Sequence, residues 1–157
     1  NDMFFFYLDE KSTYQNMFNV IYDDVNHLLW TSQINWDINS KSILNLQLDY
    51  HNYNLDSLQE YAYKPSLVSK LDFCYDIGDK ILSSVELIGK FNRSISDNSV
   101  SSVSLKNIVD LNFDLEYKYS SVFSAFFKVK NMIGSYEIWE NYPVLGPQIF
   151  FGLSFCF

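Results

Sequence analysis

The sequence is poor in the residues that punctuate or cross-link a chain: five Gly, three Pro and two Cys among 157 residues. Cys74 and Cys156 stand without a CxxC motif or a Cys/His pairing, so a zinc or redox site has little support. A single disulfide between them would require an oxidising compartment. Only 11 residues are Lys or Arg, with no basic run, which disfavours binding to nucleic acid.

Other absences narrow the class of protein further. No stretch of about 20 predominantly apolar residues occurs, which excludes a membrane protein built from transmembrane helices. The Gly-x-Ser-x-Gly and His-Glu-x-x-His motifs and glycine-rich phosphate loops are missing, so we expect neither an enzyme nor a bound cofactor. No initiator Met or signal peptide begins the sequence, which leads us to expect a mature product or a piece of something longer.

The sequence is rich in aromatic and apolar residues. Aromatic residues make up 18% of the chain, hydrophobic residues 48% and charged residues 19%, with a formal net charge of -8. This composition is too apolar and too weakly charged for a disordered tail, and the length fits one domain. Apolar mass balanced by polar residues is typical of strands in which the two alternate.

Period-two alternation of apolar and polar residues runs through most of the chain and predicts strands without a convincing helix. Leu111 and Phe113, for example, alternate with Asn112 and Asp114. Eight strands are predicted, at residues 18–22, 28–38, 44–51, 67–77, 81–91, 108–117, 123–130 and 149–157.

The connections between these strands alternate in length, which predicts an antiparallel up-and-down meander. Short turns are expected at residues 39–41, 78–79 and 120–121, and longer loops at 54–65, 92–105 and 132–147. Bacterial outer-membrane barrels show this asymmetry. The short link at 23–26 is an exception on the long-loop side.

The domain organisation follows from this series of strands. Residues 1–16 are expected to form a partial strand, at the aromatic run 4–7, and a linker. Residues 17–157 are expected to form the eight-strand meander, so that 1–157 is a single β-barrel domain or barrel segment.

The apolar face of these strands could meet either lipid or a soluble core. The strands are about 10 to 12 residues long, close to the length that crosses a bilayer at a tilt of about 45°. Their apolar rows carry no charge, and aromatic residues such as Tyr50, Tyr75 and Tyr117 gather near strand ends. This pattern predicts an all-β, antiparallel transmembrane barrel with about eight strands present. A soluble lipid-binding barrel, with its apolar face inward, is the alternative.

The opposite face carries charges of both signs and is expected to face the lumen. Its predicted members are Asp72, Asp76, Glu86, Asp110, Asn112, Asp114, Glu116, Lys128 and Lys130. These side chains would pair across strands and fill a small barrel, or line a solute-selective path through a larger one.

Two histidines are the only candidates for metal or acid/base chemistry. His27 and His51 lie near the ends of neighbouring predicted strands, on the polar face, and could join Asp23 and Asp49 in a cluster. The plainer interpretation is that both histidines are solvated, and no metal site is predicted.

The C-terminal strand ends in an alternating aromatic pattern. Its apolar row is Phe151, Leu153, Phe155 and Phe157. An aromatic final residue after such a row resembles the signal by which the barrel-assembly machinery recognises outer-membrane proteins. Any edge strand could also end in Phe, so a purely structural role stays open.

A series of motifs over about residues 17–157 resembles the C-terminal part of TonB-dependent-receptor-like outer-membrane proteins of Bacteroidota. The motifs are Tyr22-Asp23-Asp24-Val25-Asn26, Lys64-Pro65-Ser66, Asp110-Leu111-Asn112, Glu116-Tyr117, Phe123-Ser124-Ala125-Phe126, Lys130-Asn131-Met132-Ile133, Tyr136-Glu137-Ile138-Trp139, Tyr142-Pro143-Val144 and Phe151-Gly152-Leu153-Ser154-Phe155. The last 50 residues are the most specific part. Two positions depart from the family pattern: Lys130 stands before Asn131 where Asn is common, and Asn141 replaces the usual Gly.

This resemblance implies a location in the bacterial outer membrane and contact with its lipid. It also implies a role as the closing segment of a solute-uptake transporter, whose missing N-terminal part would connect it to the TonB system. Loop contacts with ligands or partners would fall to Tyr136, Trp139 and Tyr142. The alternative is a free-standing eight-stranded barrel used for anchoring or adhesion.

Overall fold

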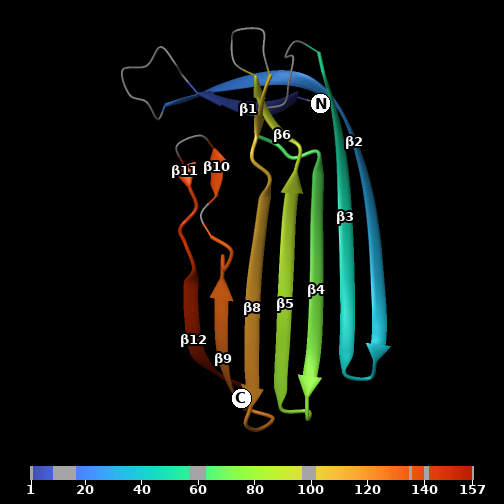
Figure 1. Cartoon of the computed structure of the whole chain (residues 1–157), viewed down its shortest axis with the longest axis vertical. Helices are drawn as coiled ribbons and strands as arrows, with labels where there is room; N and C mark the ends of the chain where they lie inside the picture. The colour runs from blue at the N-terminus through green and yellow to red at the C-terminus, as the bar shows by residue number, and fades with distance from the viewer. Residues whose placement is uncertain are drawn as a thin grey trace.

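The structure is a computed structural model that describes residues 2–8, 17–56, 63–96, 102–134, 136–139 and 142–156. Its main feature is one antiparallel sheet of eight strands (Figure 1). In their order across the sheet, the strands are β1 (Asp2–Leu8), β2 (Phe18–Asn39), β3 (Ser42–Leu55), β4 (Leu67–Ile77), β5 (Ile81–Phe91), β8 (Ile108–Lys118), β9 (Phe123–Lys130) and β12 (Gln148–Phe155). The predicted all-β antiparallel class is confirmed.

The connections differ in length at the two ends of the sheet. Short turns join β2 to β3, β4 to β5 and β8 to β9 at one end, which we call the turn end (Figure 1). Gly78 and Asp79 both have positive φ, 63° and 59°, as the type I′ turn of a tight hairpin requires. At the other end, the loop end, two small hairpins lie within the long connections. They are formed by β6 (Arg93–Ser96) with β7 (Ser102–Leu105) and by β10 (Glu137–Trp139) with β11 (Tyr142–Pro143).

One predicted connection is wrong: the link at 23–26 lies inside β2, which runs unbroken from Phe18 to Asn39. β2 changes partners there, because Phe18–Asp24 pairs with β1 and Val25–Asn39 pairs with β3. The alternation of burial also continues through the segment, with Asp23 and Val25 buried and their neighbours exposed. The two consecutive aspartates resemble a turn in composition, but their backbone stays in the ladder.

The register sorts side chains onto two opposite faces of the sheet. An aliphatic row crosses five adjacent strands on the apolar face: Ile34, Leu46, Leu71, Leu87 and Leu111. A polar row, one residue further along or back on each strand, crosses the same strands on the opposite face: Asn35, Asn45, Asp72, Glu86 and Asn112. Since successive side chains of a strand point to opposite faces, one register fixes both rows.

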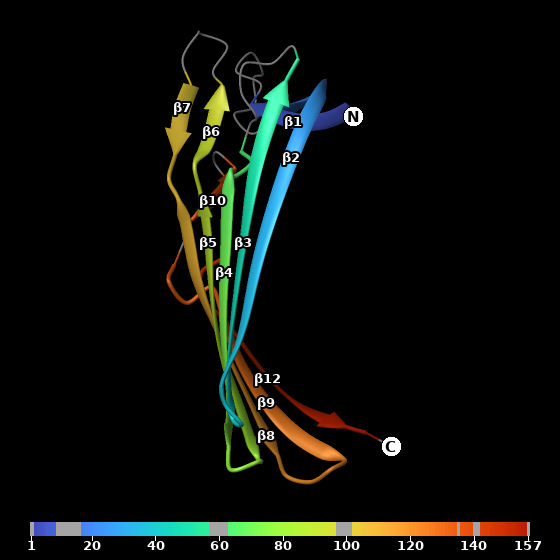
Figure 2. The ribbon, with the colours of Figure 1, turned by 90° about the vertical axis from the view of Figure 1, so that its right-hand side faces the viewer.

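The sheet is a single, strongly twisted layer (Figure 2). The few buried apolar side chains of the described residues lie at its loop end. They are Phe5, Val25, Tyr63 and Ile108. The middle of the sheet has no second layer among the described residues, so large apolar side chains such as Trp30 and Phe151 stay exposed, at 63% and 84%. Exposed apolar surface of this kind indicates contact with something outside the described chain.

Candidate functional site

The polar face of β4, β5 and β8 holds a cross-strand network. Lys70 Nζ lies 2.7 Å from Glu86 Oε1, and Asn112 Nδ2 donates to Glu86 Oε2 at 2.8 Å. The other end of the Asn112 amide accepts a hydrogen bond from the backbone N–H of Asn131, at 3.1 Å. Four groups from different parts of the chain therefore satisfy one another, which is how polar groups on a crowded sheet face are kept stable.

A second group of charges lies beside this network on β8 and β9. Asp114 receives two lysines, with Lys130 Nζ at 3.2 Å from one oxygen and Lys128 Nζ at 3.8 Å from the other. All three side chains are only partly exposed. Lys130 also interacts electrostatically with Glu86, so its charge is shared between two carboxylates and this part of the face carries mixed charge.

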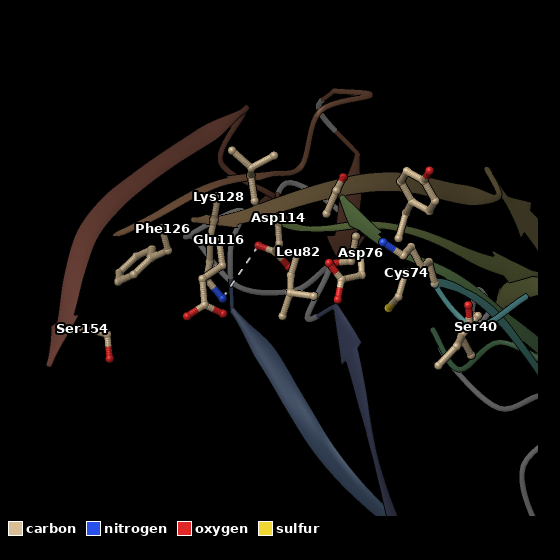
Figure 3. A pocket seen from close by; sticks show the side chains of 15 residues that line it. Ser40, Cys74, Asp76, Leu82, Asp114, Glu116, Phe126, Lys128 and Ser154 are labelled. Atoms are coloured by element: carbon tan, nitrogen blue, oxygen red, sulfur yellow. Dashed lines mark ion pairs between the residues drawn. The ribbon is translucent and has the colours of Figure 1, made fainter. Parts of the chain in front are cut away.

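Asp114 and Lys128 border a trough of about 770 Å³ on the polar face near the turn end (Figure 3). The labelled side chains come from several strands and from the β2–β3 turn, and the ion pair between Lys128 and Asp114 runs along one part of it. They are Ser40, Cys74, Asp76, Leu82, Asp114, Glu116, Phe126, Lys128 and Ser154. The lining combines carboxylates, lysines and hydroxyls with the apolar side chains of Ile43, Leu82 and Leu115 and the rings of Tyr75 and Phe126, so it is mixed in character.

The residues predicted to face the lumen lie on one side of the sheet. The register places on the polar face Asp72, Asp76, Glu86, Asp110, Asn112, Asp114, Glu116, Lys128 and Lys130. They are not equally accessible, because Asp110 and Asn112 are buried at 3% and 6% exposure while the others are partly exposed. Of this set, the trough is lined by Asp76, Asp114, Glu116 and Lys128.

At the loop end, a buried arginine that the sequence did not single out joins three connections. Arg93, 4% exposed, donates through its guanidinium to the backbone carbonyls of Tyr63, Lys106, Glu137 and Ile138. Burial lowers the pKa of Arg93 from its usual value, although the side chain stays charged at neutral pH. No sequence motif marks this residue, because its four acceptors lie on segments that are far apart in the sequence.

The predicted loop-contact residues are spread over this same region. Tyr136 is half-buried, and burial followed by the nearby charge of Asp110 raises its pKa. The Tyr142 ring lies 5.5 Å from the Phe18 ring but stays exposed, at 40%. Trp139 is opposite Tyr142 in the small hairpin, and its side chain lies outside what the structure describes. Tyr136 therefore contributes to packing at the loop end, and the role of Tyr142 in loop contacts stays a prediction.

The two histidines are brought together as a stacked pair. His27 Nε2 and His51 Nδ1 are 3.0 Å apart, and Tyr53 stacks on His27 at 4.6 Å between ring centres. Desolvation, then His51, then Lys64 lower the pKa of His27, which favours the neutral ring. In the described ranges no group of three or more His, Cys, Asp or Glu side chains is placed to hold a metal ion. Asp23 and Asp49 therefore do not complete a metal site with the histidines.

The alternating row at the C-terminus lies on the apolar face of β12. Phe151, Leu153 and Phe155 are exposed at 84%, 70% and 56%. Phe157, the last residue of the predicted assembly signal, lies outside the described residues. Both cysteines are free thiols, with Cys74 at the trough and Cys156 exposed.

Within the described ranges, no helix has the length and hydropathy needed to span a bilayer. No protein-family model matches the sequence, and no curated protein matches it. The resemblance to TonB-dependent-receptor-like proteins therefore depends on the sequence motifs alone.

Proposed function

We propose that this chain forms part of the wall of a bacterial outer-membrane β-barrel, with its apolar face against lipid and its polar face along a path for solutes. One observation carries the proposal. We call β2 from Trp30 onward, β3 up to Tyr50, β4, β5, β8, β9 and β12 the wall strands. Every charged side chain of these strands lies on the polar face, and their apolar face holds only apolar, aromatic, Ser and Gly residues. A sheet that separates charge so completely, and exposes large hydrophobic side chains, is suited to lipid on one side and water on the other.

The dimensions of the wall fit a bilayer. β4, β5 and β8 have 11 residues each. At about 3.3 Å per residue and a tilt of about 45°, such strands span about 25 Å, the height of the apolar band of outer-membrane barrels. In this proposal the membrane-spanning part of β2 begins at Trp30 and that of β3 ends at Tyr50. Trp30 pairs with Tyr50, and Tyr50 pairs with Leu67, the first residue of β4.

The remaining parts of the proposal follow the motif resemblance. The protein would be a TonB-dependent-receptor-like transporter segment, with its loop end outside the cell and its turn end in the periplasm. Phe151, Leu153 and Phe155 would be read by the barrel-assembly machinery, and the TonB system would act through a separate N-terminal part. The trough, at the turn end, would form part of the solute path.

The test compares two neighbouring positions of β2 that differ only in the face they occupy. Ile34→Arg should destabilise the protein folded in lipid vesicles by about 2–4 kcal/mol, because Ile34 lies in the aliphatic row near the middle of the wall. Asn35→Arg, in the polar row, should change stability by about 0.5 kcal/mol or less. Both are read from urea unfolding in vesicles. Equal losses at the two positions, or a stable fold in water without lipid or detergent, would contradict the proposal.

A further inference from the structure

The outer edge of β2 is bare over most of its length. β3 pairs with one side of Val25–Asn39, and among the described residues no strand pairs with the other side (Figures 1 and 2). β1 covers only Phe18–Asp24. It must lie on the side away from β3, because the N–H of Asp56, which follows β3, already donates to the carbonyl of Asp24 on the β3 side.

If β1 were extended toward its N-terminus in the same register, it would continue along this bare edge. Asp2 is opposite Asp24 and Leu8 is opposite Phe18, so each step toward the N-terminus of β1 matches one step toward the C-terminus of β2. A strand leading into β1 in the same register would place its residue nine positions before Asn1 opposite Ile34. It would run along the whole edge to Asn39 without passing through any described segment of the chain.

The edge also lacks the features by which proteins protect exposed strands. Natural edges are kept short or carry Lys, Pro or inward charges that prevent further pairing. Val25–Asn39 contains no Lys and no Pro, and its one acidic residue is Asp37. Its apolar row is strongly exposed, with Trp30 at 63% and Trp36 at 60%. An edge of this length and composition is one that is normally covered.

The directions of the strands also favour one additional strand beside β2. Seven strands of the main sheet form the wall, β2, β3, β4, β5, β8, β9 and β12, and each is antiparallel to the next. The first and last of these seven run the same way, so they cannot pair antiparallel with each other. One more strand beside β2 restores an even number, and its free side would be antiparallel to β12.

We propose that the edge of β2 from Val25 to Asn39 accepts one further strand, antiparallel to β2 and continuous in register with β1, supplied by polypeptide that leads into Asn1. The strand would carry apolar residues on the face of Ile34 and polar residues on the face of Asn35. The inference concerns the sheet edge alone, and it stands whether or not the apolar face meets lipid.

Cross-linking tests the register. The full chain, with Cys74→Ser, Cys156→Ser and Ile34→Cys, is extended before Asn1 by a designed 15-residue strand of alternating Val and Thr. One version carries a cysteine nine positions before Asn1, opposite position 34. The matched control carries it eight positions before Asn1, opposite Gln33 and on the other face. We expect the intramolecular disulfide to form at least tenfold faster in the first version, and equal rates would overturn the proposal.

A second measurement does not depend on the cysteines. Amide hydrogen exchange of the folded chain, with and without the extension, should show at least tenfold slower exchange within Val25–Asn39 when the extension is present. Unchanged exchange in a chain that circular dichroism shows to be folded would overturn the proposal. Disulfide-linked dimers through position 34 that form equally well with the extension would also overturn it, since the edge would then belong to a second copy.

Discussion

Arg93 is a buried cation whose described hydrogen-bond partners are backbone carbonyls. Its four acceptors come from the chain before β4, the connection after β7 and the β10 strand, which are 13 to 45 residues away in sequence. Burying a guanidinium is costly unless its N–H groups are satisfied, and carbonyls that have left the regular ladder need donors in turn. Arg93 meets both requirements at once, and this makes it the residue on which the loop end depends.

Arg93→Met should therefore destabilise the protein by about 1.5–3 kcal/mol, the range for hydrogen bonds to a charged group. The substitution keeps much of the apolar stem and removes the donors. Chemical unfolding in detergent measures the loss, and the exchange of the Tyr63 amide, which donates to Ser94, should accelerate with it. Lys106→Met is the control, because it removes an exposed cation from the same region and should be nearly neutral. A comparable loss in the control would show that charge, and not the carbonyl contacts, is responsible.

At the scale of the strands, β9 and β12 fit together through a glycine and a ring. Gly152 is opposite Phe126, and a Cβ at position 152 would lie 2.6 Å from the end of the Phe126 ring. The ring thus covers the glycine on the polar face, a known way of compensating for the missing side chain in a strand. Because Phe126 also lines the trough, this contact connects the last strand pair to the candidate site.

Gly152→Val should push the Phe126 ring into the trough and cost about 1 kcal/mol of stability. In the background of Phe126→Ala the same substitution should cost less, so a double-mutant cycle in urea unfolding should give a coupling between the two residues. Gly146→Ala is the control, since a Cβ there meets nothing within 4 Å. Additive effects of the two substitutions would mean that the ring and the glycine do not interact.

The strands were largely predictable because alternation has the same period as the strand itself. The placement of Leu111 and Asn112 on opposite faces of their strand follows directly from the printed sequence, whereas the rows across the sheet depend on the register. The continuity of β2 was not predictable, since it depends on a change of partner at Asp24 and Val25 that no local pattern records. The small hairpins and the place of Arg93 were missed for a similar reason: their contacts join segments far apart in sequence.

At the scale of the whole molecule, the sheet has two open edges and does not close on itself within the described residues. β2 and β12 run in the same direction, and both expose large apolar side chains, such as Trp36 and Leu153 at 60% and 70%. A free-standing small barrel formed by the wall strands alone would require a parallel contact between these edges, against the pattern of outer-membrane barrels. In the proposed function, the sheet is therefore a wall that other strands complete.

The 157-residue chain alone, folded in detergent, should therefore give no compact monomer band that shifts on boiling in gel electrophoresis. It should instead associate through its edges, with the apparent size rising as protein concentration increases. A sharp, heat-modifiable monomer band at all concentrations would mean that the chain closes on itself, and it would favour the small anchoring barrel.

Each strand of the main sheet pairs with the strand next to it in the chain, apart from the two small hairpins inserted at the loop end. Pairing therefore closes only short stretches of polypeptide, which keeps the entropy loss of each step small. The sheet can grow one strand at a time from any hairpin, and at every stage it has two growing ends. The edges of β2 and β12 are the two ends that remain. In the described part of the chain, the backbone groups along these edges are still unpaired over most of their length, as those of each earlier strand were before the next strand was added.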